Sequence, residues 1–205
     1  PNWRVYFRGT AAHNTVQIDG KEQTRYVFHK NRFKIKGPEP EYQLTHFCSG
    51  KDRGHNFDRV QGVARSHEYP VVHERTIDFF CHDSLGSDYW IVTDELRADE
   101  PHRYDLRFHL CEQALGKTTL EVVDGRFIIR SPHLLLIQPY DPAVEVAIEE
   151  GYLSRTYGVK LCAPVVCFSH TAANHSFRTI LYPSKNETPC LPPLAFAQQS
   201  LPEFL

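Results

Sequence analysis

Hydrophobic and polar residues alternate along much of this chain. The alternating positions are Val5 with Phe7, Val16 with Ile18, and the segments 33–36, 104–109 and 144–148. Successive side chains of a β-strand point to opposite faces, so a period of two predicts strands with one buried face. Two continuous apolar runs, at residues 89–93 and 134–137, predict strands that are covered on both faces.

Turn-forming residues separate these segments. The turn signals are Asp19-Gly20, Gly37-Pro38, Ser49-Gly50, Gly86-Ser87, Asp124-Gly125 and Gly151. Asp124-Gly125 lies between two apolar segments and predicts a hairpin with a type I′ turn, in which both central residues need positive φ. Roughly a dozen short strands at a spacing of ~8–12 residues predict an all-β fold, an antiparallel multi-stranded β-sandwich. No amphipathic helix longer than two turns is visible.

The chain of 205 residues fits one domain. We expect the β-sandwich to occupy residues 1–187 and a Pro-rich tail to occupy residues 188–205, because Pro189, Pro192, Pro193 and Pro202 preclude a regular strand there. The sequence contains no Met and begins at Pro1. We therefore expect a processed product or a piece of a longer protein.

Composition and charge exclude some classes of function. The formal net charge is −2 and the isoelectric point is about 6.7, which argues against a general binder of nucleic acid or of membrane surfaces. There is neither an apolar run of the ~18 residues that a membrane-spanning helix needs nor a signal peptide at the start. Residues 1–36 nevertheless carry eight Lys or Arg against Asp19 and Glu22. This basic region either faces an anionic partner such as an acidic polysaccharide or forms outward strand positions that keep the protein in solution.

Cysteine and histidine leave their own alternatives open. The six cysteines are compatible with three disulfides, but their wide spacing and mostly apolar neighbours favour small buried thiols. The twelve histidines include no HxH or HExxH pair, and no CxxC accompanies them. No nucleophile elbow, phosphate-binding loop or marked carboxylate pair is present, so catalytic residues remain unknown from pattern alone.

Residues 8–23 read R-G-T-A-A-H-N-T-V-Q-I-D-G-K-E-Q. They closely resemble the R-x-T-x-A-H-N-T-V-x-x-D-G-x-x-Q segment of the heparinase II/III-like polysaccharide lyases. Weaker matches follow in the family's order at residues 71–75, 90–96, 102–109, 154–158 and 177–183. The resemblance covers roughly residues 3–184.

This resemblance implies an architecture and a chemistry. Members combine an N-terminal (α/α) toroid of helices with C-terminal antiparallel β-sheets, and this chain resembles most of the β part. They cleave uronic-acid-containing polysaccharides by β-elimination, so the implied partners are an acidic polysaccharide and an upstream helical toroid, with no nucleic acid and no membrane insertion. The implied location is periplasmic or secreted. Several catalytic groups belong to the toroid and to an early H-x-H-x-D segment that should precede Arg8.

The resemblance also assigns candidate site residues. His13 matches a zinc ligand of those members that bind zinc, although one His cannot hold zinc alone. We therefore expect an incomplete zinc site here, with His13 as either a metal ligand or a structural residue. Asn14 is expected to bind substrate or to orient its neighbours. His73 and Arg75 are expected to face a substrate groove, with Arg75 pairing a uronate carboxylate, or to be locked in a strand network.

Three interpretations of function follow. In the first, the chain is a module of a polysaccharide lyase that is inactive without the helical domain. In the second, it is a non-catalytic carbohydrate-binding or scaffolding domain. In the third, it is a structural domain with neither role. Arg107 and His109 are expected to be structural residues in all three.

Overall fold

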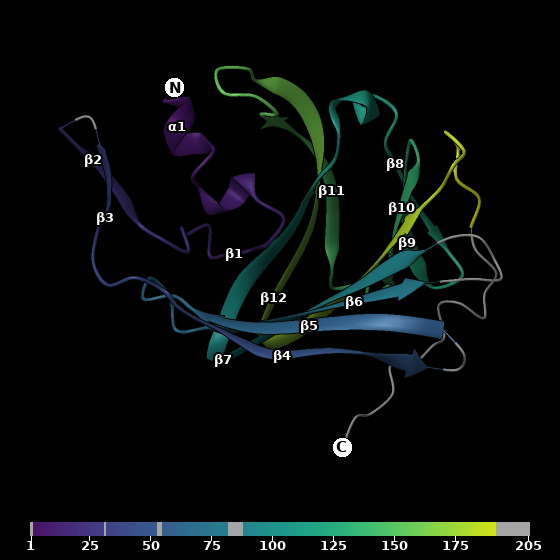
Figure 1. The fold of residues 1–205 in the computed structure, drawn as a ribbon, viewed down its shortest axis with the longest axis horizontal. Helices are drawn as coiled ribbons and strands as arrows, with labels where there is room; N and C mark the ends of the chain where they lie inside the picture. Colours follow the sequence, from purple (N-terminus) through teal and green to yellow (C-terminus); the bar gives the residue numbers. More distant parts are fainter. Residues whose placement is uncertain (1, 31, 53–54, 82–87, 192–205) are drawn as a thin grey trace.

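The computed structural model describes residues 2–30, 32–52, 55–81 and 88–191, and the fold is almost entirely antiparallel β (Figure 1). The helical elements are α1 (Trp3–Tyr6), η1 (Thr10–Ala12) and η2 (Glu112–Ala114). The strands are β1 (Val16–Ile18), β2 (Tyr26–His29), β3 (Arg32–Ile35), β4 (Glu41–Asp52), β5 (His55–Arg65), β6 (Val72–Cys81), β7 (Tyr89–His109), β8 (Thr119–Val123), β9 (Arg126–Ser131), β10 (Leu134–Pro139), β11 (Glu145–Leu153) and β12 (Leu161–Pro183).

One large sheet dominates the molecule. Its strand order is β4-β5-β6-β7-β12-β10-β9-β8, with β1 added on β7 and β11 added on β12. The expectation of uniformly short strands was wrong, because β7 has 21 residues and β12 has 23. These two strands pair with each other from Val165–His109 to Leu181–Trp90, with one register shift between Ala172 and Asn174. Strands β4, β5 and β6 continue the sheet from β7, and β10, β9 and β8 continue it from β12, so this long pair is the centre of the sheet.

The sheet folds on itself and encloses two cores, which confirms the predicted sandwich-like all-β architecture. One core gathers Val16 and Ile18 of β1 with Leu106 of β7, Leu136 of β10 and Phe168 of β12. The other core packs residues of β5, β6 and β7 against β9 and β10. Its buried members are Phe57, Phe80, Tyr89, Ile91, Ile128, Leu135, Ile137 and Ile180. Strand β10 separates the cores, since its successive side chains enter opposite ones.

The local predictions have mixed outcomes. The turns expected at Ser49-Gly50 and Gly151 were wrong, because these residues lie inside β4 and β11, and Gly86-Ser87 lies outside the described residues. Asp124 and Gly125 have φ of 49° and 69° and join β8 to β9, as a type I′ turn requires. The strand expected around Val5 and Phe7 was wrong, because these residues belong to a helical turn and its C-cap. Asn2 caps that turn by accepting the backbone N–H of Arg4. Two alternating residues are too few to distinguish a strand from a helical turn.

The cysteines differ from the expectation of mostly buried thiols. Of the six cysteines, Cys167 is buried, Cys190 is exposed, and the other four, Cys48, Cys81, Cys111 and Cys162, are half-buried. Of the predicted Pro-rich tail at residues 188–205, residues 192–205 lie outside the described residues. Residues 188–191 are described, and this part contacts the sheet, because the carbonyl of Pro189 accepts a hydrogen bond from Arg130 at 2.6 Å.

Candidate functional site: a basic, aromatic pocket at the N-terminal segment

A pocket of about 710 Å³ lies where the N-terminal segment crosses the end of β7 and the loop after β11. Its cationic side chains are Arg4, Arg8 and Lys160, its aromatic ones are Trp3, Phe7, Tyr152 and Tyr157, and its histidines are His13 and His109. None of the ion pairs among the described residues involves Arg4, Arg8 or Lys160. The pocket therefore offers uncompensated positive charge beside flat apolar rings.

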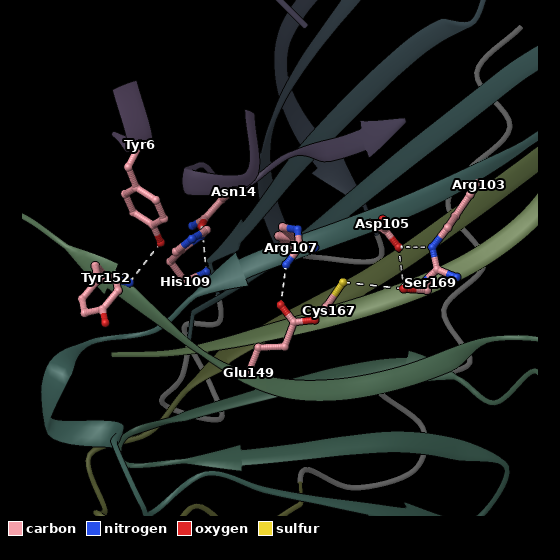
Figure 2. Close-up of polar contacts among 10 residues, drawn as sticks. All are labelled: Tyr6, Asn14, Arg103, Asp105, Arg107, His109, Glu149, Tyr152, Cys167 and Ser169. Carbon is pink, nitrogen blue, oxygen red and sulfur yellow. Dashed lines mark hydrogen bonds and ion pairs between the residues drawn. The ribbon is translucent and has the colours of Figure 1, made fainter. Parts of the chain in front are cut away.

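Aromatic contacts hold the N-terminal turn against β11. The backbone N–H of Tyr152 donates to Tyr6 Oη at 3.2 Å, as Figure 2 shows. The Trp3 and Tyr152 rings meet edge to face with centroids 5.1 Å apart. Lys160 Nζ lies 3.8 Å from the Trp3 centroid and 4.0 Å from that of Tyr152, within cation–π range. A Cβ at Gly151 would meet Val165 at 2.5 Å, so glycine allows this close packing beside Tyr152.

His109 ends β7 inside the pocket and is oriented by Asn14 (Figure 2). Asn14 Oδ1 accepts the backbone N–H of His109 at 2.8 Å and lies 3.2 Å from ring Nδ1. Because Oδ1 is an acceptor, Nδ1 has to donate, and the neutral ring then carries its lone pair on Nε2. Asn14 therefore fixes both the position and the tautomer of His109.

The surroundings of His109 favour its neutral form. Burial lowers the pKa of His109 first, and the positive charges of Arg107 and His13 lower it further, against a weaker opposing contribution from the Ala11 backbone. Arg107 stays in place through an ion pair from its Nη1 to Glu149 Oε2 at 2.7 Å. Its Nε2 is buried and has no hydrogen-bond partner among the described residues, so His109 contributes to the wall of the pocket rather than offering a free nitrogen to a ligand.

His13 is exposed and lines the same pocket. No group of three or more His, Cys, Asp or Glu that would hold a metal ion exists among the described residues. His13 and His109 alone do not make the three or four ligands that zinc takes. The residues present do not fit a zinc site, and zinc at His13 stays a prediction for a longer protein.

His73 and Arg75 lie on β6 and line a second groove of about 380 Å³ beside β4 and β5. Their polar ends meet the fully buried Asp94: His73 Nε2 is 2.6 Å from its Oδ1, and Arg75 donates to both oxygens at 2.6 and 3.0 Å. The third Arg75 nitrogen donates to the Asn14 carbonyl at 2.5 Å. A uronate carboxylate would have to compete with these partners, so the network favours the strand-locked alternative. Substrate binding by these residues stays a prediction.

The ion pairs also decide the charge of Asp94. Burial alone would raise its pKa, but the hydrogen bond with His73 and the charge of Arg75 outweigh burial and hold that pKa below its usual value. Asp94 is therefore an ionised carboxylate in the interior. Through Arg75, it ties β6 and β7 to the segment that carries His13 and Asn14.

The structure unites residues that the sequence left apart. It brings together His13, Asn14 and His109, and it leaves His73 and Arg75 in the neighbouring groove, joined through the Asn14 carbonyl. Sequence reasoning missed Trp3, Tyr152 and Lys160 and placed His109 among structural residues. Trp3 and Tyr152 are separated by most of the chain, so no local pattern would have brought them together.

Solved structures define the class of this domain. The match to the heparan sulfate lyase HepC from Pedobacter heparinus has a TM-score of 0.65 and 18% identity, covering 90% of this chain and 26% of that one. A mutant of the same lyase gives a TM-score of 0.66 at 18% identity with the same coverage, and heparinase III gives 0.58 at 16% identity, covering 91% of this chain and 26% of its own. The fold is that of a β-sheet domain found in polysaccharide lyases.

The family follows from the sequence. The model of the heparinase II/III-like, C-terminal family matches residues 1–180, and the chain belongs to this family. The resemblance carried by residues 8–23 is thereby confirmed. The chain spans about a quarter of the length of the solved lyases. No curated protein matches it.

The described helices are all short. None of them has the length and apolar character that crossing a membrane would need.

Proposed function

We propose that this chain is the β-sheet module of a polysaccharide lyase that cleaves a uronic-acid-containing polysaccharide by β-elimination, acting together with a helical toroid domain. Membership of the heparinase II/III-like family supports the lyase class. The pocket at the N-terminal segment is the observation that carries the assignment of the ligand, because cations and aromatic rings together suit an acidic sugar.

The pocket offers two kinds of contact to such a sugar. Arg4, Arg8 and Lys160 are free of carboxylate partners among the described residues, and a guanidinium pairs a carboxylate or a sulfate through two parallel hydrogen bonds. Tyr157 has 91% of its surface exposed at the pocket, where an aromatic ring gives a sugar a flat apolar face. Both features supply binding and orientation.

The reaction needs more than binding. A base removes the proton on C5, the C4–O bond breaks, a C4–C5 double bond forms, and an acid protonates the departing oxygen. Cations that neutralise the uronate carboxylate stabilise the charge that develops on it in the transition state. Because His109 Nε2 is buried, the base and the acid are both proposed to come from the toroid domain.

An absorbance assay tests the proposal. The full-length protein, incubated separately with heparin, heparan sulfate and alginate, should produce the ultraviolet absorbance of unsaturated uronate with at least one of them. The 205-residue chain alone should produce none. A steady signal from the isolated chain would contradict the need for a second domain.

The assay also separates the second candidate function. A non-catalytic carbohydrate-binding domain would retain these polymers in a binding assay while the full-length protein releases no unsaturated product from any acidic glycan. Substitution Lys160→Ala should weaken binding of a short uronate oligosaccharide, while Lys117→Ala, which removes a cation on the η2–β8 connection, should leave it unchanged.

We also propose a periplasmic or secreted location. Large acidic polysaccharides lie outside the cytoplasm, so the proposed substrate requires it. Fractionation of cells that produce the full-length protein from its own gene should recover it outside the cytoplasmic fraction.

A further inference from the structure

The β2–β3 hairpin has two unlike faces. It forms a two-stranded sheet of its own, and within the described residues it pairs with no strand of the large sheet. Directly opposed residues of a hairpin share a face. The pairs Tyr26–Ile35 and Phe28–Phe33 make one face aromatic and apolar. The pairs Val27–Lys34 and His29–Arg32, extended by Arg25 opposite Lys36, make the other face cationic.

The aromatic face docks the hairpin next to the pocket. The Arg8 guanidinium lies 4.8 Å from the Phe33 centroid and 5.4 Å from that of Tyr26, and the Arg4 guanidinium lies 5.5 Å from Phe33. Arg4 and Arg8 also line the pocket. Figure 1 shows the hairpin standing beside α1, outside the large sheet. The same two arginines therefore join the hairpin to the pocket.

The cationic face has no acidic partner among the residues that the structure describes. Arg25, Lys34, Lys36, Arg32 and His29 are exposed, and none takes part in an ion pair among the described residues. The whole chain has a formal charge of −2, so its surplus of acid lies elsewhere. Like charges set side by side on a hairpin repel each other and destabilise it. A polyanion laid along the face would relieve that repulsion.

We propose that this cationic face, defined by Arg25, Lys36, Lys34, Arg32 and His29, is an arm that binds a sulfated or carboxylated polysaccharide chain whose end occupies the pocket. The proposal rests on the proposed function. Rows two residues apart on a strand are about 6.6–6.8 Å apart, so the three rows extend over about 13 Å. That length exceeds one sugar ring, so a chain whose end fills the pocket has to continue over further sugars to cover the arm.

The arrangement of rings favours a polysaccharide over a nucleic acid. Proteins that bind single-stranded nucleic acid interleave aromatic side chains with cations, so that bases stack while phosphates pair. Here the aromatic residues Tyr26, Phe28 and Phe33 lie on the face opposite the cations. A chain that is recognised by charge alone fits the cationic face.

Heparin oligosaccharides of two lengths test the arm on the full-length protein. Lys34→Ala/Lys36→Ala should weaken binding of a dodecasaccharide by about fivefold. It should make the salt dependence of that binding shallower by roughly two in log–log slope, and it should leave unchanged the binding of a disaccharide, which is short enough to stay in the pocket. Lys51→Ala/Lys185→Ala removes the same charge from exposed positions elsewhere and should bind both like the wild type. Lys34→Arg/Lys36→Arg should keep wild-type affinity, which separates lost charge from a damaged hairpin.

Each other outcome has a definite meaning. Suppose that the wild type binds heparin and that Lys34→Ala/Lys36→Ala binds it as well as Lys51→Ala/Lys185→Ala does. The hairpin is then not a binding arm, while the proposed function stands. If both double variants weaken dodecasaccharide binding equally, the effect comes from the overall charge of the protein, and the proposal of a binding arm is overturned. If neither heparin nor alginate binds the wild type, both proposals fail together. Single-stranded DNA of equal charge that binds as tightly as heparin, and loses affinity in the hairpin variant, would overturn the choice of polysaccharide.

Discussion

At the scale of single residues, polar side chains in this domain hold other side chains in place. The side chain of Asn14 accepts hydrogen bonds from His109, and its backbone carbonyl accepts one from Arg75. One residue therefore joins the pocket to the buried Asp94 network. The conspicuous His-Asn-Thr motif thus has a structural explanation besides any contact with substrate. Its Asn orients a histidine far along the chain, at position 109, rather than its neighbour His13.

The charge of Arg107 should control the protonation of His109. Replacing Arg107 by Gln removes one of the positive charges that lower the pKa of His109, so that pKa should rise. NMR titration of the histidine ring signals measures it. Arg103→Gln removes the same charge from the same strand, where Arg103 pairs with Asp105 away from His109 (Figure 2), and should leave the pKa unchanged. An unchanged pKa of His109 in Arg107→Gln would show that the charge of Arg107 does not contribute to it.

The buried carboxylate should be essential to stability. Asp94→Ala leaves His73 and Arg75 without their partner in the interior and should lower the free energy of unfolding by about 3 kcal/mol. Glu95→Ala, one residue on, breaks a half-exposed pair with Arg97 and should cost less than about 1 kcal/mol. Urea denaturation of both variants gives the comparison. Equal losses would mean that the Asp94 network adds nothing beyond a surface pair.

At the scale of elements, the sequence predicted strands well and their lengths poorly. Alternation in residues 104–109 located the end of β7, and Asp124-Gly125 located the β8–β9 turn, because both signals are local. The joining of residues 89–109 into one strand was hidden, since several charged residues interrupt the alternation there. The aromatic contacts of Trp3 depend on Tyr152, which no local pattern reveals. Of the residues that line the pocket, only His13 was therefore predictable, because a family motif marks it together with its neighbour Asn14.

Strand β12 carries an acid-sensitive contact. The His175 ring stacks on His170 with centroids 4.1 Å apart, and burial followed by the charge of His170 lowers the pKa of His175 from 6.5 to about 4. Between these values the unfolded chain binds the proton and the folded one does not, so stability is full above pH 6.5 and decreases as the pH falls toward 4. His175→Gln should flatten this decline in urea titrations, whereas exposed His67→Gln should not. A decline of the same slope in both variants would assign the acid sensitivity to other groups.

At the scale of the whole molecule, the two cores share their strands. Strands β7 and β12 contribute side chains to both, and β10 sends Leu135 into one core and Leu136 into the other. Separate domains would have separate strands and would be able to unfold independently. Here neither core can open without breaking the β7–β12 pair on which the other is built, so unfolding should be a single cooperative transition.

Two adjacent substitutions test that cooperativity. Leu135→Ala and Leu136→Ala each remove a fully buried side chain, from opposite cores, and each should lower the free energy of unfolding by about 3 kcal/mol. Leu120→Ala, with 39% of the leucine exposed, should cost much less. In both core variants the urea transition seen by far-ultraviolet circular dichroism should coincide with the one seen by tryptophan fluorescence, with the slope unchanged. The two tryptophans report on different parts of the molecule, since Trp3 lies in α1 and Trp90 on β7. A second transition in either variant would mean that one core survives the loss of the other, and that the long central strands do not couple them.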